Sequence, residues 1–239
     1  MIDLHCHILP GLDDGALDLE DSVAMARQAQ QDGIAALCAT PHIRADHAVR
    51  IEQIATRVHA LQEGLAAAGV DVHLLPGGEL AQPHADHLSD AELRLITLGG
   101  AGVWLLLEPA AGPLDGRLQE LVERLRTRGF QAVIAHPERH AGADFIERLR
   151  RLVRAGCLIQ WTAEFVAQTR PGEVILELAR EDLVHLLGSD AHSSHGGRAV
   201  RLQAGFSRLA SVLTPTQMAW TRDQAPRAIV RGEPLMPRP

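Results

Sequence analysis

Histidines and carboxylates recur along the chain in short motifs, each placed just past a short apolar run. Imidazole nitrogens mixed with carboxylate oxygens, without thiolates, suit Zn²⁺, Mn²⁺ or iron ions. Several carboxylates gathered at one place could not all stay ionised without cations. The series therefore indicates a multinuclear metal site in an enzyme. The motifs are Asp3-Leu4-His5-Cys6-His7, Asp13-Asp14-Gly15, Thr40-Pro41-His42, Gly77-Gly78-Glu79, Leu107-Glu108-Pro109, Ala135-His136-Pro137-Glu138-Arg139 and Gly188-Ser189-Asp190-Ala191-His192.

The first motif has the spacing that a shared metal requires. In an extended segment, His5 and His7 point to the same side and Cys6 points away from it. An HxH pair by itself is a weak signal. All seven motifs in this order are a strong one.

The elements that must position these motifs alternate between short apolar runs and amphipathic stretches. This pattern is typical of parallel strands joined by crossover helices. We predict strands over Ile2 to His7, Ile34 to Thr40, Val72 to Gly77, Val103 to Glu108, Phe130 to Ala135, Cys157 to Thr162 and Leu183 to Gly188. We predict helices over Leu19 to Gln31, Ala45 to Ala68, Leu114 to Arg128, Phe145 to Arg154 and Gly172 to Arg180, followed after Ala199 by one or two helices and a Pro-rich end.

These elements predict an α/β fold of the (β/α) barrel type. A chain of 239 residues with 46% hydrophobic content can bury one substantial core, so we expect a single domain over residues 1–239. In a parallel barrel the loops after the strands open on one face, where catalytic groups collect. The motifs follow the predicted strands, so we expect their side chains to meet at that mouth.

Charge and cysteine content limit the other functions. A formal net charge of −7 argues against a general electrostatic grip on nucleic acid. Three cysteines without disulfide or zinc-ribbon spacing fit a reducing compartment. No signal peptide or long apolar segment is evident, so we expect a cytoplasmic protein that does not insert into a membrane.

These motifs resemble the polymerase and histidinol phosphatase (PHP) superfamily, whose fold is a distorted seven-stranded (β/α) barrel that holds three metals. Within it, the opening DLHCHILPGLDDGA and the ATPH, AHPER and GSDAHS segments are most similar to the manganese-dependent bacterial protein-tyrosine phosphatases of capsular and exopolysaccharide loci. The resemblance covers Ile2 to roughly Arg198.

The resemblance implies two to three divalent ions, with Mn²⁺ favoured over Fe or Zn. It implies a first metal held by His5, His7, Glu79 and Asp190, a second held by the bridging Glu79 with Glu108 and His136, and a third held by Asp14, His42 and His192. It also implies that Arg139 and Arg198 hold phosphate oxygens.

Simpler roles are open for three residues of these motifs. Asp13 can cap the turn with Gly15. Arg139 can pair with Glu138 or begin a helix. Arg198, after two glycines, can be a solvated residue in the first turn of the next helix.

Cys38 and Arg44 have the C-x5-R spacing of thiol-dependent tyrosine phosphatases. Such a loop wraps phosphate with consecutive backbone N–H groups, but Pro41 removes a donor and the segment has no glycine. We therefore predict that Cys38 is a buried core thiol.

The chain departs from its relatives at two places. Glu108 and Pro109 are adjacent, where the family usually has another residue between them, so we expect a different rim loop. Thr162 to Phe165 replaces the small-residue turn common after the sixth strand. Both departures bear on the choice of leaving group.

The resulting hypothesis is a metal-dependent phosphomonoesterase that acts as a protein-tyrosine phosphatase. The resemblance implies a substrate in the phosphorylated, tyrosine-rich tail of a membrane-associated bacterial tyrosine kinase that controls polysaccharide export. A small-molecule phosphatase, such as a histidinol phosphatase, is the second reading. A catalytically silent regulatory barrel is the third.

Overall fold

The computed structural model describes residues 1–239, and all its paired strands are parallel. The strands are β1 (Ile2–Cys6), β2 (Ala36–Ala39), β3 (His42–Ile43), β4 (His73–Pro76), β5 (Glu79–Ala81), β6 (Trp104–Glu108), β7 (Gln131–Ile134), β8 (Leu158–Thr162) and β9 (Leu186–Gly188). β2 and β3 are one bent strand broken at Thr40 and Pro41, and β4 and β5 are another broken at Gly77 and Gly78. Counted in this way, the sheet has the seven predicted strands.

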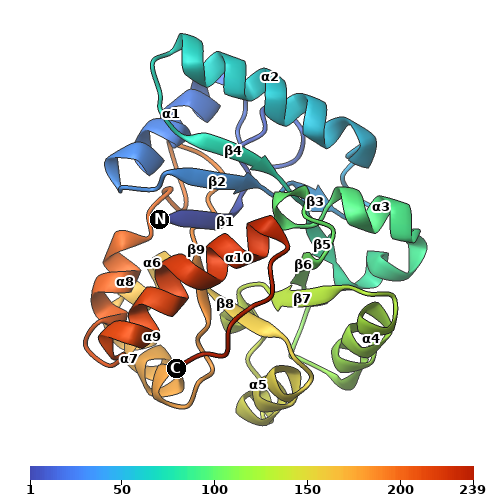
Figure 1. Ribbon diagram of the computed structural model, residues 1–239, viewed down its shortest axis with the longest axis vertical. Helices are drawn as coiled ribbons and strands as arrows, with labels where there is room; N and C mark the ends of the chain where they lie inside the picture. Colours follow the sequence, from blue (N-terminus) through green and yellow to red (C-terminus); the bar gives the residue numbers. More distant parts are fainter.

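The sheet curls into a distorted barrel (Figure 1). One part has the order β1-β2-β4 and the other the order β3-β5-β6-β7-β8-β9. The ring closes beside β1, where Cys6 bridges Ala191, the His7 N–H donates to the Ala191 carbonyl at 2.9 Å, and the Asp190 N–H donates to the His5 carbonyl at 2.9 Å. Closure therefore joins the first motif to the last.

The longer helices lie outside the strands and largely match the prediction. They are α1 (Leu19–Gln31), α2 (Ile54–Ala67), α4 (Gly116–Thr127), α5 (Phe145–Arg154) and α7 (Thr169–Arg180). Gly33 and Gly69 follow α1 and α2 with φ of +79° and +68°, a conformation that glycine adopts without steric cost.

The helix predicted over Ala45 to Ala68 begins later than expected. Residues 44–47 form a turn and residues 48–50 have no regular structure. A 3-10 turn spans Ile51–Gln53, and α2 starts only at Ile54. The Arg44 Nε and Nη2 atoms donate to Asp46 at 2.6 and 2.8 Å, which ties the chain into a local turn instead of a helix.

Several short helices were not predicted. α3 (Asp90–Leu95) begins with a capping box from Ser89 and Glu92, and α6 (Ala163–Ala167) precedes α7. α7 starts at Thr169, so Gly172 lies within it. The tail holds more helix than expected, with α8 (Gln203–Leu209), α9 (Pro215–Ala219), a π-helical turn over Trp220–Gln224 and α10 (Ala225–Arg231).

A compact apolar cluster fills the barrel below the motifs. Strand residues such as Leu4, Cys38 and Leu106 belong to it, and each precedes a motif residue on its own strand. Trp220 and Ile229 from the C-terminal helices pack into the same cluster, and α10 contacts β1 (Figure 1). The tail thus closes the end of the barrel opposite the mouth. None of the helices is long and apolar enough to cross a membrane.

Candidate metal centre

All nine predicted ligands gather at the mouth of the barrel, in four groups whose ligand atoms lie within 4.8 Å of one another. The centre of the cluster is buried, since His5, Glu79, His136 and Asp190 have no exposed surface. The rim is open, because the side chain of Asp14 is 60% exposed. The arrangement therefore joins a buried centre to an accessible edge.

Of the four ligands expected at the first metal, His5, His7 and Glu79 form one group, and Asp190 lies beside the two histidines. His5 Nε2 is 3.3 Å from Glu79 Oε2 and 3.4 Å from Asp190 Oδ1. His7 Nε2 is 3.2 Å and 3.7 Å from the same two oxygens. Two imidazole nitrogens and two carboxylate oxygens thus face one small volume.

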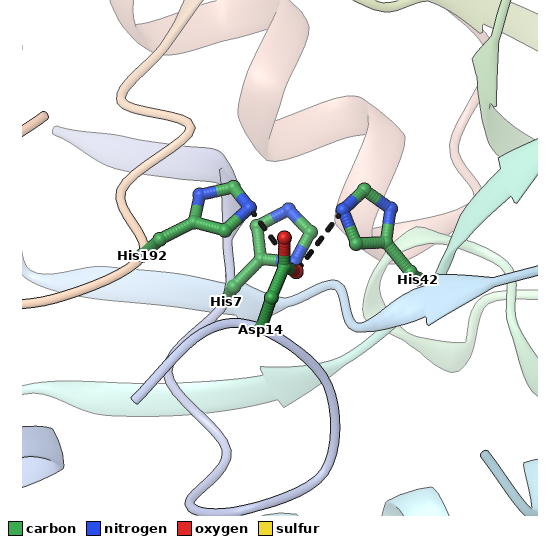
Figure 2. Close-up of side chains that lie close together, drawn as sticks. All are labelled: His7, Asp14, His42 and His192. Carbon is green, nitrogen blue, oxygen red and sulfur yellow. Dashed lines mark ion pairs between the residues drawn. The ribbon is translucent and has the colours of Figure 1, made fainter. Parts of the chain in front are cut away.

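The three ligands expected at the third metal also meet (Figure 2). Asp14 Oδ1 is 3.4 Å from His42 Nε2 and 3.7 Å from His192 Nε2. The His7 and His192 rings stack with their centroids 3.9 Å apart, which places this group directly beside the first.

The expected second set is brought together only in part. Glu79 Oε1 is 2.7 Å from His136 Nε2 while Glu79 Oε2 is 3.0 Å from His42 Nδ1, so this carboxylate faces two sides as a bridging ligand must. Glu108 Oε2 lies 4.0 Å from His42 Nδ1 and groups with His42 and Glu79. His136 groups with His5 and Asp190 instead.

Two ligands have an uncommon backbone conformation. His136 has φ of +30° and Asp190 has φ of +50°, although neither is glycine. Such conformations cost on the order of 1–3 kcal/mol each and persist where the surroundings enforce them, often at functional sites. Each lies two residues past the end of a barrel strand, β7 or β9, where the chain turns at the mouth.

Two polar side chains orient the imidazoles of the first motif. Asp13 Oδ2 accepts from His7 Nδ1 at 2.8 Å, and Asp13 Oδ1 accepts from the Gly15 N–H at 3.0 Å. Asp13 therefore caps the turn, as the simpler reading predicted, and also turns His7 Nε2 toward the cluster. Gln160 Oε1 lies 2.9 Å from His5 Nδ1, and its amide nitrogen donates to the Trp161 carbonyl at 2.9 Å. These partners fix the ring nitrogen that faces a metal.

The pKa values in the cluster are shifted because its charged groups lie close together. Burial alone would lower the pKa of His7, but hydrogen bonds to Asp13 and Glu79 outweigh it and raise this pKa to about 10. Burial alone would raise the pKa of Glu79, but His5, His136 and His42 together hold it well below its usual range. Burial and the neighbouring Glu79 raise the pKa of Glu108.

Unpartnered polar atoms test whether metal ions fit this cluster. Asp190 Oδ1 is buried and has no hydrogen-bond partner. Glu79 Oε2 and His42 Nδ1 are also buried and form no hydrogen bond, although they lie 3.0 Å apart. A buried carboxylate oxygen without a partner is costly, and divalent ions bound within the groups to which these atoms belong would satisfy them. The mixed nitrogen and oxygen donors suit Mn²⁺, iron or Zn²⁺. The residues present therefore fit divalent ions.

Both predicted arginines reach the cluster through Asp190. Arg139 donates to Asp190 Oδ2, and Arg198 Nη2 lies 3.1 Å from the same oxygen while its Nε donates to the Asp190 carbonyl at 2.7 Å. Arg139 does not pair with Glu138, whose Oε1 instead accepts from the Thr162 N–H at 3.0 Å. The arginine side chains are 38% and 33% exposed, so they line the open side of the site.

One face of α1 anchors the loop that carries His192 and Arg198. Asp21 Oδ1 accepts from the backbone N–H and the hydroxyl of Ser194 at 2.8 and 2.6 Å. Gln28 donates to the Ser194 carbonyl at 3.1 Å, and Asp32 accepts from the Leu202 N–H at 2.6 Å. These residues and Gln160 were not predicted from the sequence. Gln160 is a polar residue within the largely apolar run of β8, and this exception could have indicated a role at the site.

Two histidines outside the motifs have partners next to the cluster. His47 stacks on His42 with ring centroids 5.2 Å apart, and His140 Nδ1 donates to the Gly112 carbonyl at 2.9 Å. Cys38 is fully buried in the barrel interior, and burial raises its pKa to about 12. The structure therefore confirms that Cys38 is a core thiol.

Comparison with known proteins agrees with this geometry. Residues 1–229 match the family model described as capsular polysaccharide synthesis, CpsB/CapC. The chain is 34% identical over 199 residues to the tyrosine-protein phosphatase YwqE of Bacillus subtilis, covering 81% of this chain and 78% of that protein. It is 26% identical over 203 residues to the tyrosine-protein phosphatase CpsB of Streptococcus pneumoniae, covering 81% and 83%.

Solved structures give the same relationship. A structure from work on B. subtilis YwqE and S. pneumoniae CpsB, described as metal-dependent tyrosine phosphatases, superposes with a TM-score of 0.85 at 28% identity and covers 99% of this chain and 96% of that one. The TatD homologue YJJV of Escherichia coli superposes with a TM-score of 0.52 at 17% identity, over 98% of both chains, and shares the fold alone. Because the family model matches nearly the whole chain, this protein belongs to the CpsB/CapC family of capsular polysaccharide synthesis.

Proposed function

We propose that this protein is a metal-dependent protein-tyrosine phosphatase. The observation that carries the proposal is the convergence of five histidines and four carboxylates at the barrel mouth with two arginines on their open side. The names of its relatives, all tyrosine-protein phosphatases, support the same activity.

The proposed metal ligands are the nine predicted residues. The pairs of distances around His5 and His7 support the first site, and those around Asp14 support the third. At the second site we propose Glu79, Glu108 and His136. His42 Nδ1 is a further candidate ligand there, since it lies 3.0 Å from Glu79 Oε2 and 4.0 Å from Glu108 Oε2. Mn²⁺ is the ion we propose, with Fe and Zn as alternatives.

The divalent ions, when bound, would supply Lewis acidity and activate the attacking water. Arg139 and Arg198 would hold the equatorial phosphate oxygens and neutralise the charge that develops on them. The water oxygen bonds to phosphorus as the bond from phosphorus to the phenolic oxygen breaks. Tyrosine has a pKa near 10, so its departure requires little protonation. Gln160 and Asp13 would hold His5 and His7 in place throughout.

The shape of the site favours a peptide substrate over a small molecule. Two open hollows, of about 490 and 580 Å³, lie on either side of Arg139 and share it as a lining residue. An alkyl phosphate such as histidinol phosphate would call for an enclosed pocket and a positioned acid. A silent regulatory barrel is disfavoured because all nine ligand positions hold residues able to bind metal.

We further propose a phosphotyrosine-bearing protein as the partner, namely a membrane-associated bacterial tyrosine kinase. The family's link to capsular polysaccharide synthesis supports this choice. An open site at the barrel mouth suits a flexible, tyrosine-rich tail.

A substrate panel tests the proposed function. Phosphotyrosine peptides, phosphoserine peptides and histidinol phosphate are compared at equal concentration with Mn²⁺ present. We expect kcat/KM to be highest for the phosphotyrosine peptides, and Cys38→Ala to behave as the wild type because no thiolate takes part. Preference for histidinol phosphate would favour the small-molecule reading, and no turnover of any substrate would favour the silent barrel.

A further inference from the structure

A hollow of about 490 Å³ opens beside Glu108 and Arg139, and we call it the Pro109 hollow. One part of its wall consists of small or flat side chains, namely Ala81, Pro83, His84, Pro109, Ala110 and Ala111. Polar and charged residues, among them Arg44 and Asp46, line the rest. Ala81 lies two residues after Glu79 on β5, so both side chains point to the same face of the sheet. The hollow is therefore continuous with the proposed metal centre.

The outer wall of this hollow is held in place from both sides. The Ala110 N–H donates to Gln82 Oε1 at 2.9 Å. On the other side, His140 Nδ1 donates to the Gly112 carbonyl at 2.9 Å, and the His140 carbonyl accepts from the Leu114 N–H at 3.0 Å. The loop that follows Glu108 at the end of β6 begins at Pro109. It is thus a preformed wall rather than a free segment.

The hollow on the other side of Arg139 has a different character. It is lined by the charged or polar residues Glu138, Glu164, Gln168 and Arg198, and Phe165 is its one hydrophobic residue. Polar walls suit solvated peptide groups. The alanine and proline side of the Pro109 hollow suits a flat hydrocarbon group, which loses contact with water when it packs there.

We propose that the Pro109 hollow binds the aromatic ring of phosphotyrosine while the phosphate lies at Arg139. This inference rests on the proposed function and adds the position of the leaving group. The ring adjoins the phosphate in the substrate, as the hollow adjoins Arg139 and Glu108 in the protein. The proline faces and the His84 ring offer flat surfaces for stacking. Phosphoserine has no ring to fill this space, so the hollow selects aryl over alkyl phosphates.

Filling the hollow tests its role. Ala110→Leu and Ala111→Leu place extra carbon atoms on the preformed wall, where they compete with the ring for space. We expect KM for a phosphotyrosine peptide and for p-nitrophenyl phosphate to rise about tenfold or more. The inhibition constant of inorganic phosphate should stay within about twofold, because free phosphate has no ring. Ala66→Leu, at an exposed alanine of α2 outside both hollows, is the matched control and should leave KM for p-nitrophenyl phosphate unchanged.

A second variant guards against misfolding of the first two. His84→Ala removes a half-buried wall residue without adding bulk and should raise KM for both aryl phosphates several-fold. Unchanged KM in His84→Ala and in every folded leucine variant, with a wild type active on phosphotyrosine, would overturn the ring site but leave the proposed function standing. A wild type inactive on phosphotyrosine would overturn the function itself.

Discussion

Asp190 contacts both the proposed metal ligands and the two arginines proposed to hold phosphate. Its Oδ1 faces His5 and His7, while its Oδ2 accepts from Arg139 and lies 3.1 Å from Arg198 Nη2. One carboxylate thus connects the buried cluster with the two partly exposed arginine side chains. The arginines therefore lie beside the proposed metal ligands without belonging to them, so the two proposed roles can be separated by mutation.

Arg139→Ala and Arg198→Ala should retain metal but lose turnover. Each removes a charged contact to phosphate that strengthens in the transition state, so kcat/KM should fall on the order of 10² or more. Elemental analysis and steady-state kinetics on the same preparations measure both properties. Arg151→Ala, which breaks only an exposed pair with Glu147, is the control. Near-native kinetics in both site variants would remove these arginines from the phosphate site.

Gln160 holds the imidazole of one proposed ligand, His5, and its substitution tests this role. In Gln160→Leu the His5 Nδ1 atom loses its partner at 2.9 Å, so the ring is free to rotate or to adopt the wrong tautomer. We expect Mn²⁺ affinity, measured by calorimetric titration of the stripped protein, to fall about 10- to 100-fold. Gln160→Glu keeps an acceptor at this place and should recover much of the affinity. Equal affinity in the leucine variant would mean that His5 needs no such support.

Among the elements, α1 has a role that its amphipathic pattern does not reveal. Asp21 Oδ2 accepts from the Leu17 N–H at 3.2 Å, and Asp21 Oδ1 accepts from the Ser194 N–H at 2.8 Å. The first bond holds the end of the loop that carries Asp14, and the second holds the loop that carries His192. One buried carboxylate therefore fixes the distance between two ligands expected at the third metal.

Asp21→Ala should weaken metal binding at the proposed third site, although Asp21 is not itself a proposed ligand. We expect the Mn²⁺ content to fall by about one ion per chain, as in Asp14→Ala, with turnover reduced about tenfold or more because the third site no longer forms. Elemental analysis after desalting gives the stoichiometry. Glu20→Ala, an exposed neighbour on the same helix, should keep full content. Full occupancy in Asp21→Ala would show that the loops hold their positions without it.

The strands and ligand motifs could be predicted because each has a local signal. Apolar runs mark the strands, and a ligand such as His136 stands next to a strand end in a distinctive motif. Short helices such as α3 and α6 complete too few turns to show periodicity. Asp21 and Gln160 act through hydrogen bonds to residues more than 150 positions away, which only the closed barrel brings near.

For the whole molecule, the metal centre joins the first and last strands of the barrel. The first motif lies on β1 and at its end, and Asp190 follows β9, where the ring closes. Buried carboxylates converge there from separate strands, and they repel one another when no cation is bound. Loss of metal should therefore weaken the whole barrel rather than one loop.

Reloading stripped protein with Mn²⁺ should raise its melting temperature. Ligand that binds only the native state at a hundredfold excess over Kd adds about 2.7 kcal/mol, equivalent to roughly 5–10 °C for a chain of this size. Thermal unfolding followed by circular dichroism measures the shift. The double variant His42→Ala, Asp14→Ala should shift less. An unchanged midpoint in the wild type would argue that no such site assembles.

The most direct test of the central claim is the hydrolysis of a phosphotyrosine peptide by one preparation before and after metal removal. We predict that dialysis against a chelator abolishes phosphate release and that added Mn²⁺ restores it. His5→Ala, which lacks a ligand from the buried centre, should stay inactive after the same addition. Undiminished phosphate release by the chelated wild type, with metal content confirmed as negligible, would contradict a metal-dependent phosphatase.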